Sequence, residues 1–282
     1  MDRVSKLANQ IRFRRNRLLS YYLLDFSPKE RIMLWRNLIR NEFIKTIEEV
    51  IQTISYNQVQ EFIVLNLNYR TDRRSHIDKE FESQSIKFSF FSAINGNKLN
   101  VDIKEYITQR TFRNLSNGSI GCAVSHMKIW ENVAQRKGND IFCIFEDDVL
   151  LIDGFKERLN NLIRNLPVDF DLIILGSFNT RGRDILFHVS FQNLFRSYNP
   201  RRGMYSYIIN SKSARKLINL IKPIDLLYGG IDTIIGKLAR QNKIIVYHAN
   251  PSFTKVDYNF ESDIYNFSLR KTKKIYNQGK CW

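Results

Sequence analysis

Short apolar runs alternate with segments of helical periodicity from residue 61 onwards. The runs have the length and composition of buried strands, and they cover residues 61–67, 86–91, 141–145, 170–175, 204–209 and 244–247. Between them, the spacing of apolar positions predicts a helix ending at residue 83 and further helices at 119–133, 153–165, 211–221 and 230–240. Strands that alternate with helices predict an α/β domain with a mostly parallel central sheet, which we place at residues 61–255.

The first sixty residues have a different pattern, which predicts helices alone. Ser27-Pro28-Lys29-Glu30 combines an N-cap serine, a proline at the first helical position and a glutamate at the third. An apolar stripe follows as far as Ile54, and a more basic helix is expected at residues 7–24. Residues 1–60 are therefore predicted to be a basic helical extension packed on the domain, with docking to a membrane surface or a partner as the alternative. Residues 256–282 are aromatic and basic without periodicity, and we expect a tail packed on the domain.

Composition narrows the class of protein. The 282-residue chain is too rich in aliphatic and aromatic residues to be disordered as a whole. No apolar run reaches the roughly 18–20 residues that cross a bilayer, and no secretory signal is visible. The three cysteines, Cys122, Cys143 and Cys281, are too few and too irregularly spaced for a disulfide framework or a zinc site. These features predict a cytoplasmic protein without a signal peptide or transmembrane segment.

Positive charge is concentrated at the N-terminus. The chain holds 44 Lys and Arg against 28 Asp and Glu, a formal net charge of +16, and residues 1–45 hold 11 of these basic residues against 4 acidic ones. A basic surface attracts anionic partners. We therefore expect residues 1–57 to make peripheral contact with an anionic membrane surface. A nucleic-acid-binding protein without catalysis is an alternative that rests on charge alone.

Three consecutive carboxylates, Glu146, Asp147 and Asp148, follow the apolar run at residues 141–145. In open α/β sheets, ligands collect beyond the carboxyl ends of the strands. Like charges at such an edge repel one another unless a cation neutralises them, and Mg²⁺ and Mn²⁺ prefer carboxylate and phosphate oxygens. The triplet therefore indicates a metal site, with an acidic turn or a helix cap as the alternative.

Two further segments contain candidate functional residues. Arg70, Arg73 and Arg74 lie in the loop after the first predicted strand, and guanidinium groups beside a helix N-terminus suit a phosphate or diphosphate. The alternative is a solvated helix face on which Asp72 pairs locally. The segment Gly121-Cys122-Ala123-Val124-Ser125-His126 contains a cysteine and a histidine, for which packing and structural hydrogen bonds are the simpler interpretation.

Taken in order, these segments resemble glycosyltransferase family 25, which contains lipooligosaccharide and collagen hydroxylysine galactosyltransferases. The resemblance covers roughly residues 61–255 and not the first sixty. It rests on segments whose order and spacing fit the family, namely Ile63-Val64-Leu65-Asn66-Leu67 with Arg70, Asp72 and Arg73, Phe91-Ser92-Ala93-Ile94-Asn95-Gly96, Gly121 to His126 with Ile129-Trp130, Phe145-Glu146-Asp147-Asp148-Val149, Asp171 to Gly176, Tyr205 to Leu217, Pro223-Ile224-Asp225 and Asp232.

The resemblance implies a nucleotide-diphosphate-sugar-binding domain of the GT-A type, a divalent cation (Mn²⁺ or Mg²⁺), and inversion at the anomeric carbon. Within the acidic motif, which holds the metal and the ribose, Asp148 is the expected metal ligand and Glu146 a second one. Asn68, Arg70 and Arg73 are expected near the base and phosphates, and the residues after the second strand near the uridine. The expected nucleotide-sugar-binding residues are thus Asn68, Arg70, Arg73, Ala93, Asn95, Gly96, Glu146 and Asp147.

Inverting transfer needs a base that takes the proton from the acceptor hydroxyl. Asp232 follows two glycines and opens a predicted helix, so we expect it to be this base, with Asp225 as the second candidate and helix capping as the alternative for both. His248 follows the last predicted strand. It resembles the C-terminal histidine that supplies a third metal ligand in several GT-A enzymes, with a surface-loop histidine as the alternative.

The predicted function is a metal-dependent glycosyltransferase that moves a hexose, galactose from UDP-galactose, to a hydroxyl of a glycan or glycoconjugate. The first alternative keeps the fold and changes the acceptor to hydroxylysine in a collagen-like protein. The second is the nucleic-acid-binding protein, which gives no reason for three acids at a strand end. A degenerate relative without catalysis is a third alternative, against which the presence of the acidic triplet counts.

Overall fold

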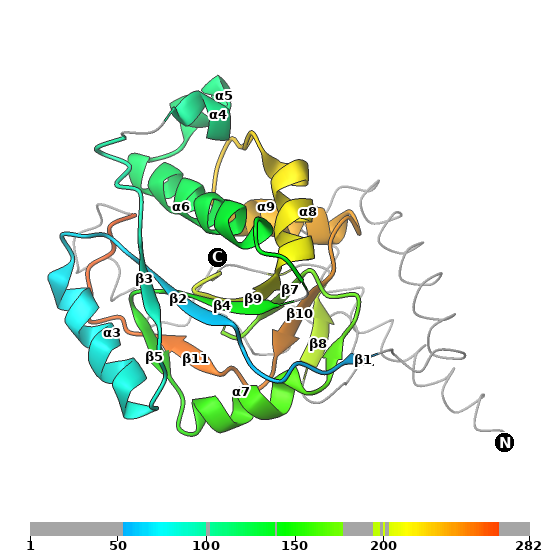
Figure 1. The fold of residues 1–282 in the computed structure, drawn as a ribbon. Helices are drawn as coiled ribbons and strands as arrows, with labels where there is room; N and C mark the ends of the chain where they lie inside the picture. Colours follow the sequence, from blue (N-terminus) through cyan, green and yellow to red (C-terminus); the bar gives the residue numbers. More distant parts are fainter. Residues whose placement is uncertain are drawn as a thin grey trace, which may run out of the picture.

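The computed structural model describes residues 53–99, 102–138, 140–176, 194–197, 200 and 203–264. At its centre lies a seven-stranded sheet with helices on both faces (Figure 1). Across the sheet the strands are β3 (Ser89–Ser92), β2 (Glu61–Asn66), β4 (Ile141–Glu146), β9 (Ser206–Asn210), β7 (Leu172–Ile174), β10 (Val246–Ala249) and β8 (Leu194–Ser197).

Five of the seven strands run in one direction. β3, β2 and β4 are parallel neighbours, as are β7 and β10, whereas β9 is antiparallel to both β4 and β7 and β8 is antiparallel to β10. The prediction of an α/β domain with a mostly parallel sheet is confirmed, and the reversal of β9 and β8 makes the sheet a mixed one.

Five helices cover the two faces of this sheet. On one face lie α6 (Asn117–Ala134), α8 (Ser211–Ile221) and α9 (Ile231–Arg240), whose apolar residues form one core cluster with the sheet. On the other face lie α3 (Thr71–Ser83) and α7 (Phe155–Ile163), which contribute to a second cluster (Figure 1). All five were predicted from apolar spacing, because each buries one stripe against the sheet.

Smaller elements surround this framework. β1 (Thr53–Ile54) pairs with β6 (Leu166–Pro167), and β5 (Val149–Leu151) pairs with β11 (Thr254–Val256). α4 (Ile103–Tyr106) and α5 (Gln109–Asn114) lie between β3 and α6. The sequence analysis predicted none of these short elements. None of the helices in the part of the chain that the structure describes is long and apolar enough to cross a membrane.

The helical expectation does not hold for residues 53–60. The backbone there forms β1 and a loop, which pack on the domain through Ile54, Tyr56 and Val59. The Tyr56 amide donates to the Ile163 carbonyl at 2.9 Å, which ties this segment to the end of α7. The rest of the predicted extension, residues 1–52, lies outside the described residues.

After β11 the chain passes the carboxyl edge of the parallel strands. We call residues 257–264 the strap, because they cross from the acidic triplet to the first turn of α6. At one end the Asp257 amide donates to the carbonyl of Asp148 at 2.7 Å, and at the other the Ser116 hydroxyl donates to the Ile264 carbonyl at 3.3 Å. The strap therefore spans the sheet edge at which the predicted site residues lie.

Candidate functional site

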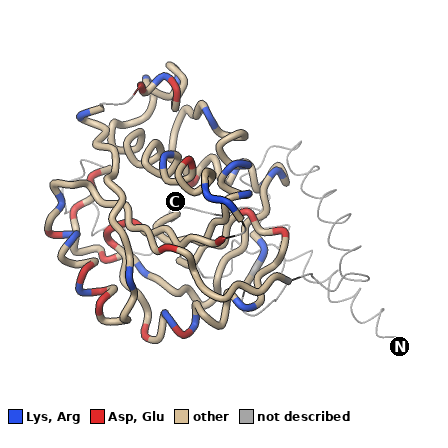
Figure 2. Tube along the Cα trace, in the orientation of Figure 1, with Lys and Arg blue, Asp and Glu red and all other residues tan. Residues whose placement is uncertain are grey.

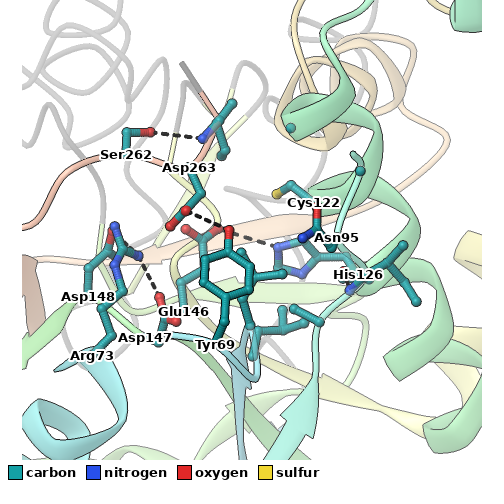
Figure 3. Close-up of a pocket in the computed structure, with 18 of the residues that line it drawn as sticks. Tyr69, Arg73, Asn95, Cys122, His126, Glu146, Asp147, Asp148, Ser262 and Asp263 are labelled. Atoms are coloured by element: carbon teal, nitrogen blue, oxygen red, sulfur yellow. Dashed lines mark hydrogen bonds and ion pairs between the residues drawn. The ribbon is translucent and has the colours of Figure 1, made fainter. Parts of the chain in front are cut away.

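A cavity of about 110 Å³ lies at the carboxyl edge of β2 and β4 (Figure 3). Segments far apart in the sequence form its walls: the end of β2, the loop at residues 93–97, the first turns of α6, the acidic triplet and the end of the strap. This is where ligands bind in open α/β sheets. The predicted site residues that line the cavity are Arg73, Ala93, Asn95, Gly96, Glu146, Asp147 and Asp148.

Asp147 uses both carboxylate oxygens in protein contacts. Arg73 Nη1 donates to Oδ1 at 2.5 Å, and Asn66 Nδ2 donates to Oδ2 at 2.8 Å. Burial raises the pKa of Asp147, although Arg73 and Asn66 act in the opposite direction. Asn66 was not predicted as a site residue, because a single polar residue at the end of an apolar strand gives no separate signal. Asp147 thus holds Arg73 and Asn66 in place at the cavity wall.

The two carboxylate oxygens of Asp148 differ in their contacts. Its Oδ1 is buried and has no hydrogen-bond partner among the described residues, whereas Oδ2 lies 3.2 Å from Arg73 Nη1. Burial raises the pKa of Asp148 to about 7, the charge of Glu146 adds to this increase, and Arg73 opposes it. A buried carboxylate oxygen without a partner is costly. A divalent cation would supply the missing positive charge, so the triplet fits a metal ion.

Glu146 faces α6 across the cavity. Its Oε1 lies 3.4 Å from His126 Nε2, and its side chain is 28% exposed, whereas His126 is fully buried. His126 Nδ1 lies 3.0 Å from the hydroxyl of Tyr207, which also accepts from Trp130 Nε1 at 2.9 Å. A structural, hydrogen-bonded histidine was the favoured interpretation of His126 in the sequence, and its contact with Tyr207 agrees with it. The link to Glu146 was missed because the two residues are 20 positions apart on different elements.

Cys122 completes this side of the cavity. Its thiol lies on the same face of α6 as His126, and its pKa is raised well above the usual value by burial and then by the charges of Glu146 and Asp232. The thiol is therefore protonated at neutral pH and is a poor nucleophile, which agrees with the interpretation from the sequence.

The two predicted phosphate-binding arginines contact the strap. Arg70 forms ion pairs with Asp72 and Asp263, and Tyr69 donates its hydroxyl to Asp263 at 2.8 Å (Figure 3). The pKa of Asp72 falls to about 2, chiefly because Arg70 donates a hydrogen bond to it. The carbonyl of Glu261 accepts from Arg70 at 3.1 Å and from Arg73 at 2.8 Å. Protein carbonyl and carboxylate oxygens thus contact both guanidinium groups.

Close backbone packing fixes the loop at residues 93–97. A Cβ on Gly96 would lie 1.7 Å from the Asn117 carbonyl oxygen, and one on Gly121 would lie 2.5 Å from the Ile94 carbonyl oxygen. Ser125 accepts from the Ile94 amide at 2.8 Å. Only glycine allows this approach at either position, so these two residues hold Ala93 and Asn95 against the first turns of α6.

Five predicted site residues do not line the cavity, and one of them is Arg70, which contacts the strap. Asn68 is exposed in the turn after β2. Asp225 pairs with Arg110 and accepts from Thr108 at 2.9 Å, and these hydrogen bonds lower its pKa, which makes it a weak base. The Nε2 atom of His248 is buried without a partner among the described residues, and burial lowers the pKa of this imidazole to about 4.

Asp232 does not line the cavity, but its charge acts on a residue that does. It lies in the first turn of α9, where its Oδ1 accepts from the Thr233 amide at 2.8 Å, and Gly230 is the N-cap residue of this helix. Its charge nevertheless raises the pKa of Cys122, which lines the cavity. The first turn of α9 is therefore electrostatically coupled to the site.

The sheet edge thus combines acidic side chains, one with a buried oxygen to spare, and two arginines beside a helix N-terminus. These groups have the chemistry that would suit a phosphorylated ligand together with a cation. The family model described as "Glycosyltransferase family 25 (LPS biosynthesis protein)" matches residues 59–235. The chain belongs to glycosyltransferase family 25, as the resemblance of its motifs predicts.

Curated relatives agree with this membership. The chain is 29% identical to a "Putative glycosyltransferase" of Haemophilus influenzae, over 64% of each protein. It is 28% identical to the "Lipooligosaccharide biosynthesis protein lex-1" of the same organism, over 68% of this chain and 74% of the relative. It is 29% identical to "Procollagen galactosyltransferase 1-A" of Xenopus laevis, over 66% of this chain and 32% of the relative. The chain therefore spans between a third and three quarters of the length of these relatives.

Proposed function

We propose that this chain is a metal-dependent glycosyltransferase that moves a hexose, galactose from UDP-galactose, to a hydroxyl of a glycan or glycoconjugate with inversion. The observation that carries the proposal is Oδ1 of Asp148, which is buried beside Arg73 at the carboxyl edge of the sheet and has no hydrogen-bond partner in the described part of the chain. Family membership supports sugar transfer as the reaction class. The GT-A type of fold and a cytoplasmic location remain parts of the same proposal.

Asp148 and Glu146 are the residues proposed to hold Mn²⁺ or Mg²⁺. When bound, such an ion neutralises the negative charge that builds up on the departing diphosphate. Asp147 has a different role, because Arg73 and Asn66 use both of its oxygens. It positions Arg73, whose guanidinium group faces the phosphates in the proposed complex. His248 remains a weaker candidate ligand, since its side chain does not line the cavity.

Donor binding requires a rearrangement of the strap. The cavity of about 110 Å³ is smaller than the roughly 300–1,000 Å³ of ligand pockets. Asp263 and the Glu261 carbonyl contact the arginines in the way that phosphate oxygens would. We infer that the diphosphate of the donor takes over these contacts and that residues 260–264 move away as it enters.

Asp232 is the proposed base for the acceptor hydroxyl. It lies in the first turn of α9, shortly after the exposed residues Leu227 and Tyr228. Its negative charge contributes to the raised pKa of Cys122 in the cavity wall. A carboxylate in this place would accept the hydroxyl proton as the oxygen attacks the anomeric carbon. Asp225 remains the second candidate, although Arg110 lowers its basicity.

The acceptor distinguishes two versions of this function. The Haemophilus relative is named for lipooligosaccharide biosynthesis and the Xenopus relative for procollagen galactosyl transfer. Transfer from UDP-galactose to an oligosaccharide and to a hydroxylysine-containing collagen peptide should be measured side by side with Mn²⁺. Product on the oligosaccharide supports the main proposal, product on the peptide supports the alternative, and product on neither contradicts both.

We propose that the enzyme works at a membrane surface. The segment 1–45 contains 11 basic and only 4 acidic side chains, and this positive charge would attract anionic lipid. Flotation with liposomes that contain anionic lipid, compared between the full chain and a chain without residues 1–57, tests this part. We expect the full chain alone to float. Equal flotation of the two proteins contradicts the membrane contact and leaves the proposed reaction untouched.

A further inference from the structure

Cys122, His126 and Glu146 form a compact cluster on the α6 side of the cavity. Cys122 and His126 are four residues apart, so they lie one above the other on the helix face that meets the end of β4. The thiol sulfur, one imidazole nitrogen and one carboxylate oxygen all lie within 4.8 Å of one another. Figure 3 shows the three side chains converging on one part of the cavity.

The donor atoms of this cluster differ in kind from those of Asp148. A sulfur, a nitrogen and an oxygen suit a borderline-soft ion such as Zn²⁺, which three protein ligands and a water can hold. Mn²⁺ and Mg²⁺ prefer oxygen ligands alone. Glu146 is the only residue that belongs to both sets, so the two sets of donor atoms differ in chemistry and share one carboxylate.

Hydrogen bonds behind His126 favour metal binding. Trp130 Nε1 can only donate, so the Tyr207 oxygen is an acceptor in that contact, at 2.9 Å. The same oxygen can accept a second bond from Nδ1–H of His126, 3.0 Å away. In that tautomer Nε2 presents its lone pair towards Glu146. Metal-binding histidines usually donate their other N–H to a partner of this kind.

The charge around Cys122 also favours a cation. Glu146, Asp147 and Asp148 line the same cavity as Cys122, and their negative charges repel a thiolate there. A divalent ion bound between the thiolate and Glu146 would offset that repulsion. As the sulfur–metal bond forms, the thiol proton leaves to solvent.

We propose that Cys122, His126 and Glu146 bind a thiophilic divalent cation of the Zn²⁺ class, at a site separate from that of Asp148. Occupation of this site withdraws Glu146 from the donor site, and this consequence for sugar transfer rests on the proposed function. The binding itself does not, because it depends only on the geometry of the three ligands.

The test is a titration of the full-length, metal-free protein with Cd²⁺, followed by the ultraviolet charge-transfer absorption of a cadmium–thiolate bond. The double variant Cys143→Ser/Cys281→Ser keeps Cys122 as its only thiol. We expect an absorption band that saturates at one equivalent of Cd²⁺ in this variant and disappears when Zn²⁺ is added. The single variant Cys122→Ser should lack the band, although it keeps the other two thiols.

Substitution of the other ligands separates a three-ligand site from a lone thiol. Glu146→Gln and His126→Gln should each lower the affinity for Cd²⁺ by at least about 10-fold. Because His126 is fully buried, thermal unfolding is measured for each variant, and the partly exposed Glu146 supplies the second test if His126→Gln does not fold. A band that persists in Cys122→Ser, or an unchanged affinity in a folded Glu146→Gln protein, overturns the proposal.

The outcome is independent of that for the proposed function. A protein that shows the cadmium band but turns over no nucleotide sugar keeps the thiophilic site and loses the transferase. A protein that transfers sugar but shows no cadmium band keeps the transferase and loses the thiophilic site. Where both are found, Zn²⁺ should inhibit transfer, and removal of Zn²⁺ with a chelator should restore it.

Discussion

Asp147 and Asp148 are adjacent in the sequence, yet their carboxylates have different surroundings. Arg73 and Asn66 bind both oxygens of Asp147, whereas Oδ1 of Asp148 is buried without a partner among the described residues. The two residues therefore have separate roles, one in positioning Arg73 and the other as the candidate metal ligand. The sequence indicated a metal site at the triplet, but three equal acids in a row cannot reveal which oxygen stays available.

Asp148 predicts an unusual dependence of stability on pH in the metal-free protein. Its pKa is about 7 in the folded state and 3.8 as the ordinary value, so the folded protein binds the proton more tightly. Stability should therefore fall as the pH rises from about 4 to about 7, by at most roughly 4 kcal/mol from this group. Urea unfolding with EDTA at pH 5 and pH 8 measures the fall.

Asp148→Asn has no such proton to lose, so its unfolding free energy should depend less on pH over the same range. Mn²⁺ should stabilise the parent protein at pH 8 and leave Asp148→Asn nearly unchanged. An equal pH dependence in the two proteins would contradict a raised pKa of Asp148 in the folded protein.

His248 is expected to change the free energy of unfolding in the opposite direction, because its contribution to stability falls as the pH falls. Burial lowers the pKa of its imidazole to about 4 from the ordinary 6.5, so the folded protein disfavours the protonated form. Stability from this group is complete above about pH 6.5 and is lost as the pH falls through about 4. We expect His248→Leu to reduce the acid-induced loss of stability, measured by urea unfolding at pH 7 and pH 4.5. The affinity for Mn²⁺ should stay within about threefold of the parent value, and a 10-fold loss would restore His248 as a metal ligand.

At the scale of elements, the strap and the loop at residues 93–97 both pack on the first turns of α6. A Cβ on Gly118 would lie 2.6 Å from the Asp263 carbonyl oxygen and from Ile264 Cα. One turn later, a Cβ on Gly121 would meet Ile94 and Gly96 instead. The same Gly→Ala change at these two positions therefore tests two neighbouring elements separately.

Gly118→Ala should displace the strap without unfolding the domain. Since the strap contacts Arg70 and Arg73, its displacement should strengthen the binding of UDP in the presence of Mn²⁺, by about 3- to 10-fold. Calorimetric titration with UDP measures this effect, and limited proteolysis within residues 257–264 reports on the strap itself. Weaker UDP binding would mean that the strap is part of the donor site rather than its competitor.

Gly121→Ala is the matched substitution. The new methyl group meets backbone atoms that cannot swing aside, so we expect a loss of about 1–3 kcal/mol of unfolding free energy and weaker binding of UDP. Thermal unfolding and the same titration measure both. Stability equal to that of the parent protein would show that the loop at residues 93–97 adapts, and Asn95 would then not be held in place by this contact.

The main elements could be predicted from the sequence because each has a strong local pattern. β2, β4, α6 and α8 bury continuous runs or wide stripes, so the predicted and observed bounds agree closely. The pairs β1–β6 and β5–β11 could not be predicted, since each strand has two or three residues and its partner lies about 100 positions away. β3 and β10 begin two or three residues later than expected, because the apolar runs start before the first residue whose backbone is paired in the sheet.

The residues of the candidate site divide in the same way, into those with a local signal in the sequence and those that meet only through the fold. The acidic triplet and Arg73 carry a local signal and were found, and the loop residues Ala93, Asn95 and Gly96 followed from the resemblance. Asp263 was missed because it meets Arg70 only through the fold, 193 residues later in the chain. Long-range contacts between single charged residues leave no periodic pattern in a sequence.

At the scale of the whole molecule, the distribution of charge over the described residues favours the enzyme over the nucleic-acid-binding alternative. In Figure 2 acidic and basic residues are interspersed along the described chain. Four acidic residues, Glu146, Asp147, Asp148 and Asp263, line the cavity. A nucleic-acid-binding surface needs a continuous basic face. We expect any binding of single- or double-stranded DNA to be weak at 150 mM salt, as measured by fluorescence anisotropy. Tight binding that Asp148→Ala leaves unchanged would favour the alternative.

The most direct test of the account is the Mn²⁺-dependent turnover of a panel of UDP-hexoses by three proteins. These are the parent, Asp148→Ala, and Asp153→Ala, in which an exposed carboxylate five residues away is removed. We predict hydrolysis or transfer of at least one UDP-hexose by the parent and by Asp153→Ala, and a loss of at least about 100-fold in Asp148→Ala. No turnover of any nucleotide sugar by the parent, or equal turnover by Asp148→Ala, would contradict a cation held by the acidic triplet as the centre of the reaction.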